Sequence, residues 1–358
     1  MSEQFSISNS QFPAAHRCAL IAMSGGVDST VAAMLALGDG LDCTGATMTL
    51  HSVGNSGETD ARAAAQRLGI PFLVFDFSDC FAARVIERFI SVYREGRTPN
   101  PCVDCNKHIK FGLFLEKAIE LGKDCIVTGH YARTERDGSG RYLLKKAADL
   151  SKDQSYVLYT LSQEQLARTR FPVGSLSKTE VREYASRAGI IDADKRESQD
   201  LCFVPDGDYA KFIGEYTGQK PRKGRFVDAG GNDLGENNGI VHYTIGQRRG
   251  LGLSMPHPPY VLELRPDDNT VVVGKDEMLY SRTLYAGNIN FIPFDKLETP
   301  IRAHVKIRYR HTEQPATVSQ TDDDVLRIEF DKPQRAITKG QAAVIYDGDV
   351  VLGGGTII

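Results

Sequence analysis

The sequence lacks any hydrophobic run near the roughly 18 residues that a membrane-spanning helix needs, so helical membrane spans are not expected. It has no apolar stretch before Cys18, which argues against a signal or transit peptide, and residues 1–17 are predicted to form a disordered leader. The net charge is only −3, so the chain is not a uniformly basic nucleic-acid binder, although local patches can differ from this average.

Cysteine is scarce, and its count of seven is odd. Without an export signal, these cysteines are not expected to form a disulfide framework, and the cytosol is the predicted compartment. Cys18, Cys43 and Cys125 lie in or beside apolar segments and are predicted to be packed as small hydrophobic side chains. Cys80 opens a helical pattern, and its role stays open.

Strand-like and helix-like segments alternate through the first 200 residues. Apolar segments typical of buried strands cover 18–23, 44–50, 72–76 and 124–128. Helical patterns lie near 28–37, 58–68, 80–95, 106–121 and 178–188, the last opening with a capping-box sequence at 177–180. Such alternation predicts a doubly wound parallel sheet with helices on both faces, and ligands at the carboxyl ends of its strands.

The pattern changes after about residue 205. Gly, Pro, Asn and charged residues dominate 217–259, and short β-like segments follow at 260–264, 270–274, 301–309, 317–321, 326–330 and 342–346. This spacing predicts a small C-terminal β-barrel. The predicted α/β chain therefore has three domains: a parallel-sheet domain at 18–207, a central mixed α/β domain at 208–282 and a β-barrel at 283–358.

The segment Ser24-Gly-Gly-Val-Asp-Ser29 joins the first predicted strand to the first predicted helix. A strand, a glycine-rich turn and a helix N-terminus together point free backbone N–H groups at an anion. The glycines permit close approach, hydroxyl groups including that of Thr30 add donors, and Asp28 could hold Mg²⁺ beside a phosphate. No lysine completes a Walker-type motif; SGGxDS instead resembles the pyrophosphate loop of ATP pyrophosphatases.

Cys102 and Cys105 form a C-x-x-C sequence between a proline-rich turn and a helical pattern, and Cys202 follows in another loop-like segment. The helix N-terminus and the charges of Lys107 and Lys110 are predicted to lower the pKa of the first two thiols. Because no second C-x-x-C or His pair is present, a structural zinc site is disfavoured. Two alternatives stay open: the three cysteines bind an iron–sulfur cluster, or they carry out sulfur chemistry, which better fits a nucleotide-activating enzyme.

Eight motifs in order carry a resemblance over residues 18–358. They are the pyrophosphate loop, Gly96-Arg-Thr-Pro-Asn-Pro with Cys105-Asn-Lys, Thr128-Gly-His-Tyr131, Lys152-Asp-Gln-Ser-Tyr156, Phe171-Pro-Val-Gly174, Cys202-Phe, YTIGQRRGLG at 243–252 and Leu352-Gly-Gly-Gly355. Together they resemble the bacterial tRNA-specific 2-thiouridylases (MnmA), a family with an ATP-pyrophosphatase loop.

The resemblance implies ATP-dependent 2-thiolation of the wobble uridine (U34) in the tRNAs for Lys, Glu and Gln. ATP would adenylate O2 of the uracil ring and release pyrophosphate; a cysteine persulfide would then deliver sulfur to C2, and AMP would leave. The implied cofactors are ATP and Mg²⁺. The implied partners are tRNA and either a persulfide-carrying relay protein or a cysteine desulfurase.

The resemblance also assigns residues. Cys202 would hold the persulfide, and Cys105 would be the nucleophile that forms a transient disulfide with Cys202. ATP would be bound by Ala22, Met23, Ser24, Gly25, Gly26, Val27, Asp28, Ser29, Met48 and Gly129. The target base would face Asn100, Pro101 and Cys102. The tRNA would contact His130, Lys152, Asp153, Gln154, Arg308, Tyr309 and Gln341.

One departure from the family concerns Cys102, where many relatives carry Asp. The role of Cys102 is left open. Because Cys102 completes the C-x-x-C sequence, an iron–sulfur cluster held by Cys102, Cys105 and Cys202 stays open as the alternative to a metal-free site. His130 could equally be a histidine at a strand end without a role.

Two basic clusters are consistent with an RNA partner, although a solvated surface is the alternative for each. Five side chains alternate along one predicted strand and so share one face, opposite Val305, Ile307 and Tyr309: Arg302, His304, Lys306, Arg308 and Arg310. The central region, which the resemblance implies is a tRNA-binding domain, adds six basic residues without nearby acids: Lys220, Arg222, Lys223, Arg225, Arg248 and Arg249.

Two other functions are possible for a chain with this loop. An ATP-dependent amide or amidine synthetase would not need Cys105 or Cys202, and a non-enzymatic RNA-binding protein would not cleave ATP.

Overall fold

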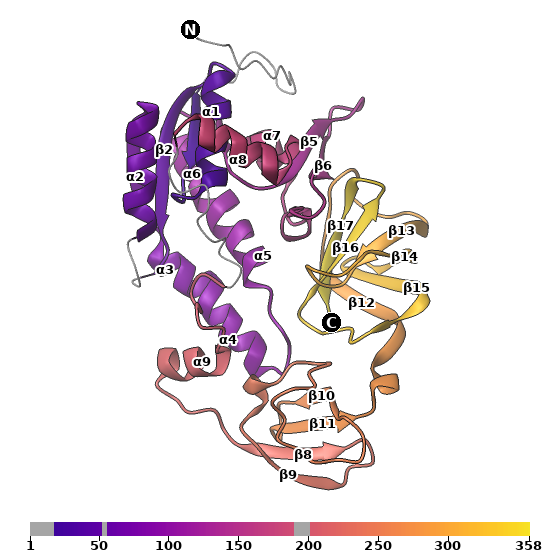
Figure 1. Ribbon diagram of the computed structural model, residues 1–358. Helices are drawn as coiled ribbons and strands as arrows, with labels where there is room; N and C mark the ends of the chain where they lie inside the picture. The colour runs from indigo at the N-terminus through magenta and orange to yellow at the C-terminus, as the bar shows by residue number, and fades with distance from the viewer. Residues whose placement is uncertain (1–17, 52–55, 190–200) are drawn as a thin grey trace.

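The computed structural model describes residues 18–51, 56–189 and 201–358. The predicted leader, residues 1–17, lies outside these ranges. The chain forms a parallel-sheet domain, a small central sheet below it in Figure 1, and a β-barrel beside both. Within the described ranges, no helix is long and apolar enough to cross a membrane.

Strand β1 (Cys18–Ala22) is the middle strand of a five-stranded parallel sheet with the order β3-β2-β1-β4-β7. The other strands are β2 (Asp42–Thr49), β3 (Phe72–Asp76), β4 (Cys125–Val127) and β7 (Thr169–Arg170). Leu20 is buried in the hydrophobic cluster on one face of the sheet, and its neighbours Ala19 and Ile21 are buried in the cluster on the other. The predicted parallel sheet, covered on both faces, is therefore confirmed.

The helices of this domain follow the predicted pattern, with one shift that matters for the site. They are α1 (Val27–Gly38), α2 (Ser56–Leu68), α3 (Ser78–Phe81), η1 (Ala82–Ile86), α4 (Glu87–Arg94), α5 (Pro101–Cys105), η2 (Asn106–Leu113), α6 (Phe114–Glu120), η3 (Ser155–Val157), α7 (Gln163–Ala167), η4 (Pro172–Ser175) and α8 (Lys178–Arg187). The capping box at the start of α8 is confirmed. The helix predicted from residue 106 instead begins at Pro101, a residue suited to the first helical turn, so the C-x-x-C sequence is helical.

A hairpin absent from the sequence-based prediction ties this domain to the barrel. Strands β5 (Ala132–Arg136) and β6 (Tyr142–Lys146) pair with each other, and β6 also pairs with strand β17 (Val350–Ile357). In Figure 1 the hairpin lies at the edge of the parallel-sheet domain, next to β17 of the barrel. The hairpin therefore fixes one domain against the other through backbone hydrogen bonds.

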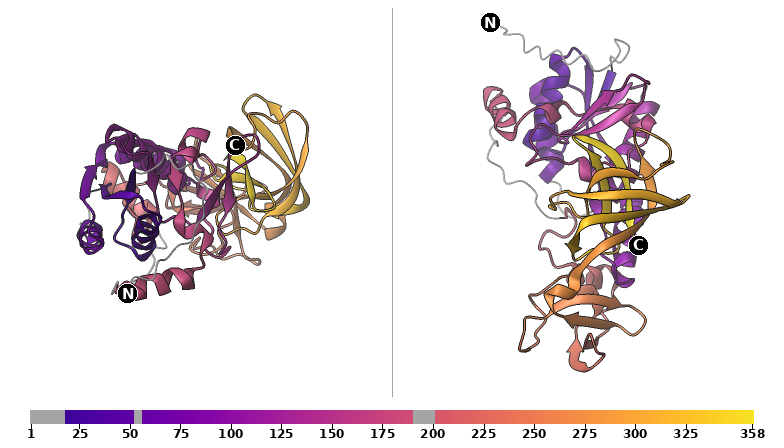
Figure 2. Two further views of the ribbon diagram at one scale, coloured as in Figure 1. Left: turned by 90° about the horizontal axis from the view of Figure 1, so that it is seen from above. Right: turned by 90° about the vertical axis from the view of Figure 1, so that its right-hand side faces the viewer.

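The barrel has six antiparallel strands in the order β12-β15-β14-β13-β16-β17, closed by pairing between β12 and β17. Besides β17, the barrel strands are β12 (Tyr280–Phe291), β13 (Ile301–Lys306), β14 (Gln314–Asp322), β15 (Val325–Arg335) and β16 (Ala342–Asp347). The right-hand view of Figure 2 shows it between the parallel-sheet domain and the central sheet. The predicted C-terminal barrel is confirmed.

The central domain holds a separate sheet with the order β10-β11-β8-β9. Its elements are α9 (Tyr209–Thr217), β8 (Gly224–Asp228), β9 (Asp233–Asn237), η5 (Ile240–His242), β10 (Tyr260–Arg265), β11 (Thr270–Gly274) and η6 (Asp276–Leu279). The β-like segments at 260–264 and 270–274 thus belong to this sheet and not to the run of barrel strands, because β11 pairs in parallel with β8.

Candidate active site

The glycine-rich turn after β1 leaves backbone donors exposed at the start of α1. Gly25 has a φ of 76°, and a Cβ there would lie 2.5 Å from Asp60 Cβ, so only glycine fits. The first α1 N–H groups, those of Val27, Asp28 and Ser29, have no acceptor among the described residues. Free N–H groups at the positive end of a helix dipole favour a phosphate at this turn.

Hydroxyl groups shape the turn from inside. The Oγ atoms of Ser24 and Ser29 lie 3.2 Å apart, and Ser29 Oγ donates to the Gly26 carbonyl at 3.0 Å. Gly129, at the end of β4, packs against the same turn, where a Cβ would lie 2.7 Å from the Ser29 backbone nitrogen. These contacts hold the turn in one shape before any ligand arrives.

The Asp28 carboxylate at this turn is engaged by two donors from distant elements. Lys178 Nζ lies 2.7 and 2.9 Å from its two oxygens, and the Tyr131 hydroxyl donates to it at 2.7 Å. A Mg²⁺ ion on Asp28, as predicted, would have to displace the Lys178 ammonium group. In this arrangement the residues present therefore do not fit a resident Mg²⁺ at Asp28.

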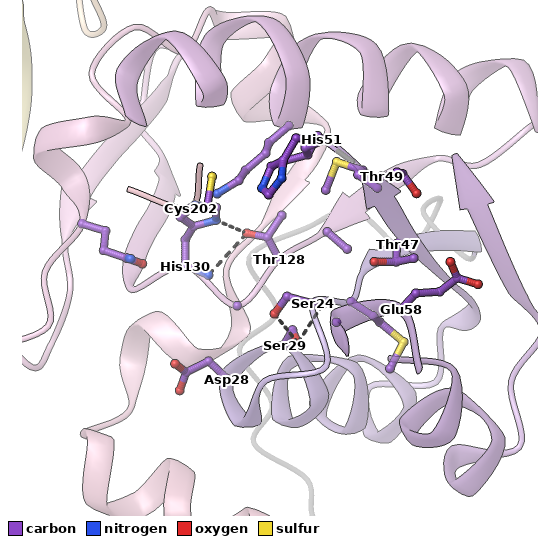
Figure 3. Close-up of a pocket in the computed structure, with 18 residues that line it drawn as sticks. Ser24, Asp28, Ser29, Thr47, Thr49, His51, Glu58, Thr128, His130 and Cys202 are labelled. Carbon is purple, nitrogen blue, oxygen red and sulfur yellow. Dashed lines mark hydrogen bonds between the residues drawn. The ribbon is translucent and has the colours of Figure 1, made fainter. Parts of the chain in front are cut away.

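A cavity of about 400 Å³ opens at the carboxyl ends of β1, β2 and β4. Figure 3 shows Ser24, Asp28 and Ser29 on one side of it and Cys202 and His130 on the other. Seven predicted ATP-binding residues line it: Ala22, Met23, Ser24, Asp28, Ser29, Met48 and Gly129. The other three, Gly25, Gly26 and Val27, face a second cavity on the far side of the turn. The cavity therefore brings the predicted nucleotide loop and the predicted persulfide cysteine together.

The three candidate cysteines differ in exposure. Cys102 and Cys202 reach the surface, whereas Cys105 is buried in the hydrophobic core with 8% of its surface exposed. All seven cysteines lie in the described ranges, and each is a free thiol. The charges of Cys102 and Cys202 both act on Cys105, so the three thiols lie in one neighbourhood although they come from α5 and from the segment after residue 200.

The prediction that the thiol pKa values are lowered is wrong. Burial raises the pKa of Cys105 to about 11 and also raises the pKa of Cys102 and of Cys202. The positive charge of Lys110 opposes this shift at all three thiols, but it does not outweigh desolvation. Sequence proximity to a helix N-terminus could not reveal how strongly the surrounding protein desolvates the thiols.

The iron–sulfur alternative has no support from the geometry. Among residues 18–51, 56–189 and 201–358, no group of three or more His, Cys, Asp or Glu side chains is placed to hold a metal ion. Cys102, Cys105 and Cys202 are therefore not arranged as a ligand set, and no step is assigned to a cluster.

The second cavity, of about 1070 Å³, separates the glycine-rich turn from the barrel. Cationic side chains from both domains line it: Lys146, Lys152, Lys178, Arg182, Lys306 and Arg310. Four of the predicted tRNA contacts also line it: Lys152, Asp153, Gln154 and Tyr309. The Asp153 carboxylate is nevertheless largely buried, and it accepts hydrogen bonds from the Ala147 N–H and the Ser155 hydroxyl. Ser24 and Asp28 line both cavities, as does Gln154, so the two cavities meet at the turn.

The predicted target-base segment is fastened to the barrel. Gln341 Nε2 donates to the carbonyls of Thr98 and Pro99 at 3.2 and 2.9 Å, next to Asn100. Asn100 also contacts the buried Tyr156 hydroxyl, near which the Arg308 guanidinium lies. The Gln341 amide, predicted as a tRNA contact, is thus occupied in holding this segment.

His130 is buried in the wall of the first cavity. Its Nδ1 lies 2.9 Å from Thr128 Oγ1, and its ring packs against Phe111 and Phe171. Burial, aided by the charge of Lys110, lowers the pKa of His130 well below its usual value. The side chain is therefore neutral near pH 7.

Both predicted basic clusters need correction. Strand β13 ends at Lys306, so the five alternating residues do not share one strand face. Tyr309 is 42% exposed and lines the same cavity as Lys306 rather than facing the barrel core. Arg302 is paired with Asp331.

In the central domain, two of the six basic residues do have nearby acids. Lys223 pairs with Glu236 and Arg225 with Asp233, both acids lying on the neighbouring strand β9. Lys220, Arg222, Arg248 and Arg249 form no ion pair within the described ranges. The unpaired positive charge of this domain is therefore smaller than its sequence indicates.

Three family profiles match the chain in order: "tRNA methyl transferase HUP domain" at residues 17–206, "tRNA methyl transferase PRC-barrel domain" at 210–275 and "Aminomethyltransferase beta-barrel domain" at 281–357. A tRNA-specific 2-thiouridylase MnmA of Clostridioides difficile is 47% identical over 94% of this chain and 97% of its own length. The MnmA of Symbiobacterium thermophilum is 47% identical over 94% and 91%.

A protein of the same name from Lachnoclostridium phytofermentans is 45% identical over 95% of this chain and 99% of its own. A solved 4-thiouridine synthetase in complex with RNA and ATP overlaps 54% of this chain and 46% of that chain, with a TM-score of 0.36 and 19% identity. That structural likeness is too weak to carry an argument.

Proposed function

This chain belongs to the MnmA family of tRNA-specific 2-thiouridylases, and on that premise we propose that it uses ATP to replace the C2 oxygen of U34 by sulfur in the tRNAs for Lys, Glu and Gln. One observation carries the proposal: Cys202 lines the same cavity as Ser24, Asp28 and Ser29 of the glycine-rich turn. A sulfur carrier and a phosphate-binding turn in one cavity suit a reaction in which an adenylated base meets a persulfide.

ATP binds, in this proposal, with its phosphates on the N–H groups at the start of α1 and with the remainder in the first cavity beside Met48 and Gly129. O2 of the uracil attacks the α-phosphorus, and pyrophosphate leaves. Mg²⁺ would enter with the ATP phosphates, since Lys178 already neutralises Asp28. When bound, it would neutralise part of the negative charge on the phosphates.

The sulfur step uses two cysteines. The terminal sulfur of a Cys202 persulfide attacks C2 and displaces AMP, which leaves the base joined to Cys202 through a disulfide. The Cys105 thiolate then attacks Cys202 Sγ, and 2-thiouridine departs while a Cys105–Cys202 disulfide forms. A thiol reductant must reopen that disulfide before the next turnover. The exposure of Cys202 supports loading by a persulfide-carrying protein or a cysteine desulfurase.

The tRNA would lie across the cationic second cavity, with Lys152, Gln154 and Tyr309 against the backbone and Asn100 near the target base. A base in a folded anticodon loop must leave its stack to reach a buried cavity. Arg182, Lys306 and Arg310 line this cavity without an ion pair to any described residue, which supports phosphate contacts. We also propose that the three domains meet at residues 207/208 and 282/283 and that the protein acts in the cytosol.

The test is ATP-dependent thiolation of unmodified transcripts of the three tRNAs, detected by retardation in a mercury-containing gel. A U34→C transcript of the lysine tRNA is the matched control. One AMP and one pyrophosphate per thiolated tRNA, with no reaction of the control, are expected. Cleavage of ATP to ADP, or equal labelling of the control, would refute the proposed reaction.

A further inference from the structure

Lys110 is a cation in the first cavity that the proposed reaction has not used. It belongs to the π-helical segment η2, directly after the helix that carries Cys102 and Cys105. Its side chain lines the cavity together with Cys202 and Ser24. It is partly buried, and among the described residues it has no ion-pair partner. An unpaired, partly desolvated ammonium group invites an anionic partner that is absent from the resting protein.

Among the described charged side chains around the thiols, Lys110 differs from the others because its charge acts on all three. Its charge favours the thiolate at Cys102, Cys105 and Cys202 alike. Asp104 acts in the opposite sense on Cys102 and Cys105, and it is held by Arg88 at 3.1 Å. The other lysine of the segment, Lys107, is exposed, and its charge acts on Asp104 and His108. Among residues 18–51, 56–189 and 201–358, Lys110 is therefore the cation that lines the cavity and acts on all three sulfur atoms.

We propose that Lys110 is a positioning residue for sulfur transfer, whose ammonium group pairs with the anionic sulfur carried by Cys202 and directs it into the first cavity. The inference rests on the proposed function, because it assumes that Cys202 carries the sulfur. It adds a residue that binds the sulfur rather than the nucleotide. The pairing would give the partly buried Lys110 ammonium group an anionic partner and stabilise the nucleophile at the same time.

The test measures thiol reactivity of the full-length protein without ATP or tRNA. Iodoacetamide labelling of each cysteine is followed by peptide mass spectrometry between pH 6.5 and 10 in the wild type, Lys110→Met, Lys110→Arg and Lys107→Met. At pH 7.5 Lys110→Met should lower the Cys202 labelling rate about tenfold, the effect of a shift of one pKa unit. Lys110→Arg should restore most of the rate. Lys107→Met should match the wild type, and Cys18 should react equally in all four proteins.

An unchanged pH profile of Cys202 in Lys110→Met would overturn the proposal. If the KM for ATP is raised as well, Lys110 is a phosphate ligand instead. Should Lys110→Met not fold, as judged by its melting curve, Lys110→Gln takes its place. If the four proteins label as expected but the wild type thiolates no tRNA, the proposed function fails, and with it the sulfur-transfer role of Lys110. Labelling that does not depend on Lys110 in a protein that thiolates tRNA overturns the inference alone.

Discussion

Lys178 of helix α8 places its ammonium group 2.7 and 2.9 Å from the two carboxylate oxygens of Asp28, at the start of helix α1. The two residues lie 150 positions apart in the sequence. The turn lacks the lysine of a Walker motif, and the structure supplies one from another helix. Because Lys178 also lines the second cavity, its charge would stand beside the phosphates of an ATP bound at the turn as proposed.

Removal of this charge should therefore weaken use of ATP. Lys178→Met is expected to lower kcat/KM for ATP by about tenfold or more, since a charge-assisted contact contributes about 1.5–3 kcal/mol. Lys178→Arg should retain part of the activity. The exposed Arg187→Met on the same helix is the control and should leave the rate of pyrophosphate release unchanged. Equal rates in Lys178→Met and Arg187→Met would show that Lys178 only packs against Asp28.

Cys105→Ser should stop the reaction after sulfur reaches the base. Without the second thiol, the base stays joined to Cys202 through a disulfide, so a covalent protein–tRNA adduct should accumulate. Gel electrophoresis of a single turnover, with and without dithiothreitol, detects it. The predicted band disappears on reduction and is absent in a Cys105→Ser, Cys202→Ser double variant. Wild-type turnover by Cys105→Ser would remove Cys105 from the reaction.

The pH dependence follows from the raised pKa of Cys105. Burial raises it to about 11, so the thiolate is a small fraction at pH 7 and grows about tenfold per pH unit below that value. Where attack by Cys105 limits the reaction, the rate of single-turnover product release should rise with a slope near one in log rate between pH 7 and pH 9. His130, which is neutral throughout this range, should add no inflection. A flat profile would contradict a rate-limiting attack by a buried Cys105 thiolate.

Gln341→Ala tests whether this side chain serves docking or tRNA binding. Loss of its bonds to Thr98 and Pro99 should lower the free energy of unfolding by about 1–2 kcal/mol and loosen the Asn100 segment. The measurement is denaturant unfolding beside the KM for tRNA. The neighbouring, exposed Lys339→Ala is the control. A raised KM with unchanged stability would instead indicate a direct tRNA contact.

Local features were predictable because short-range patterns determine them. The strand, turn and helix around Ser24–Ser29 and the capping box at Ser177 follow from residues within one or two turns of the chain. The hairpin Ala132–Lys146 has mixed polarity, and its partner is strand β17, so no local pattern indicates it. The position of β10 and β11 likewise depends on pairing with β8, which lies far away in the sequence.

In the site, too, local features were predictable and contacts between distant segments were not. Ser24, Asp28 and Ser29 of the turn and Cys202 were predicted, and all four line one cavity. Lys178 and Tyr131 were not predicted as partners of Asp28, since only the fold brings them to the turn. The raised thiol pKa was missed for a related reason: desolvation depends on packing in three dimensions, whereas the nearby lysines are visible in the sequence.

The most direct test of the account is thiolation of an unmodified lysine tRNA transcript by wild type and by Cys202→Ser. It is run anaerobically, on metal-free protein and on protein reconstituted with iron, and read in a mercury-containing gel. The account predicts thiolation by the metal-free wild type, no gain from iron, and none by Cys202→Ser in either form. Thiolation by Cys202→Ser, or by the wild type only after iron is added, would contradict it.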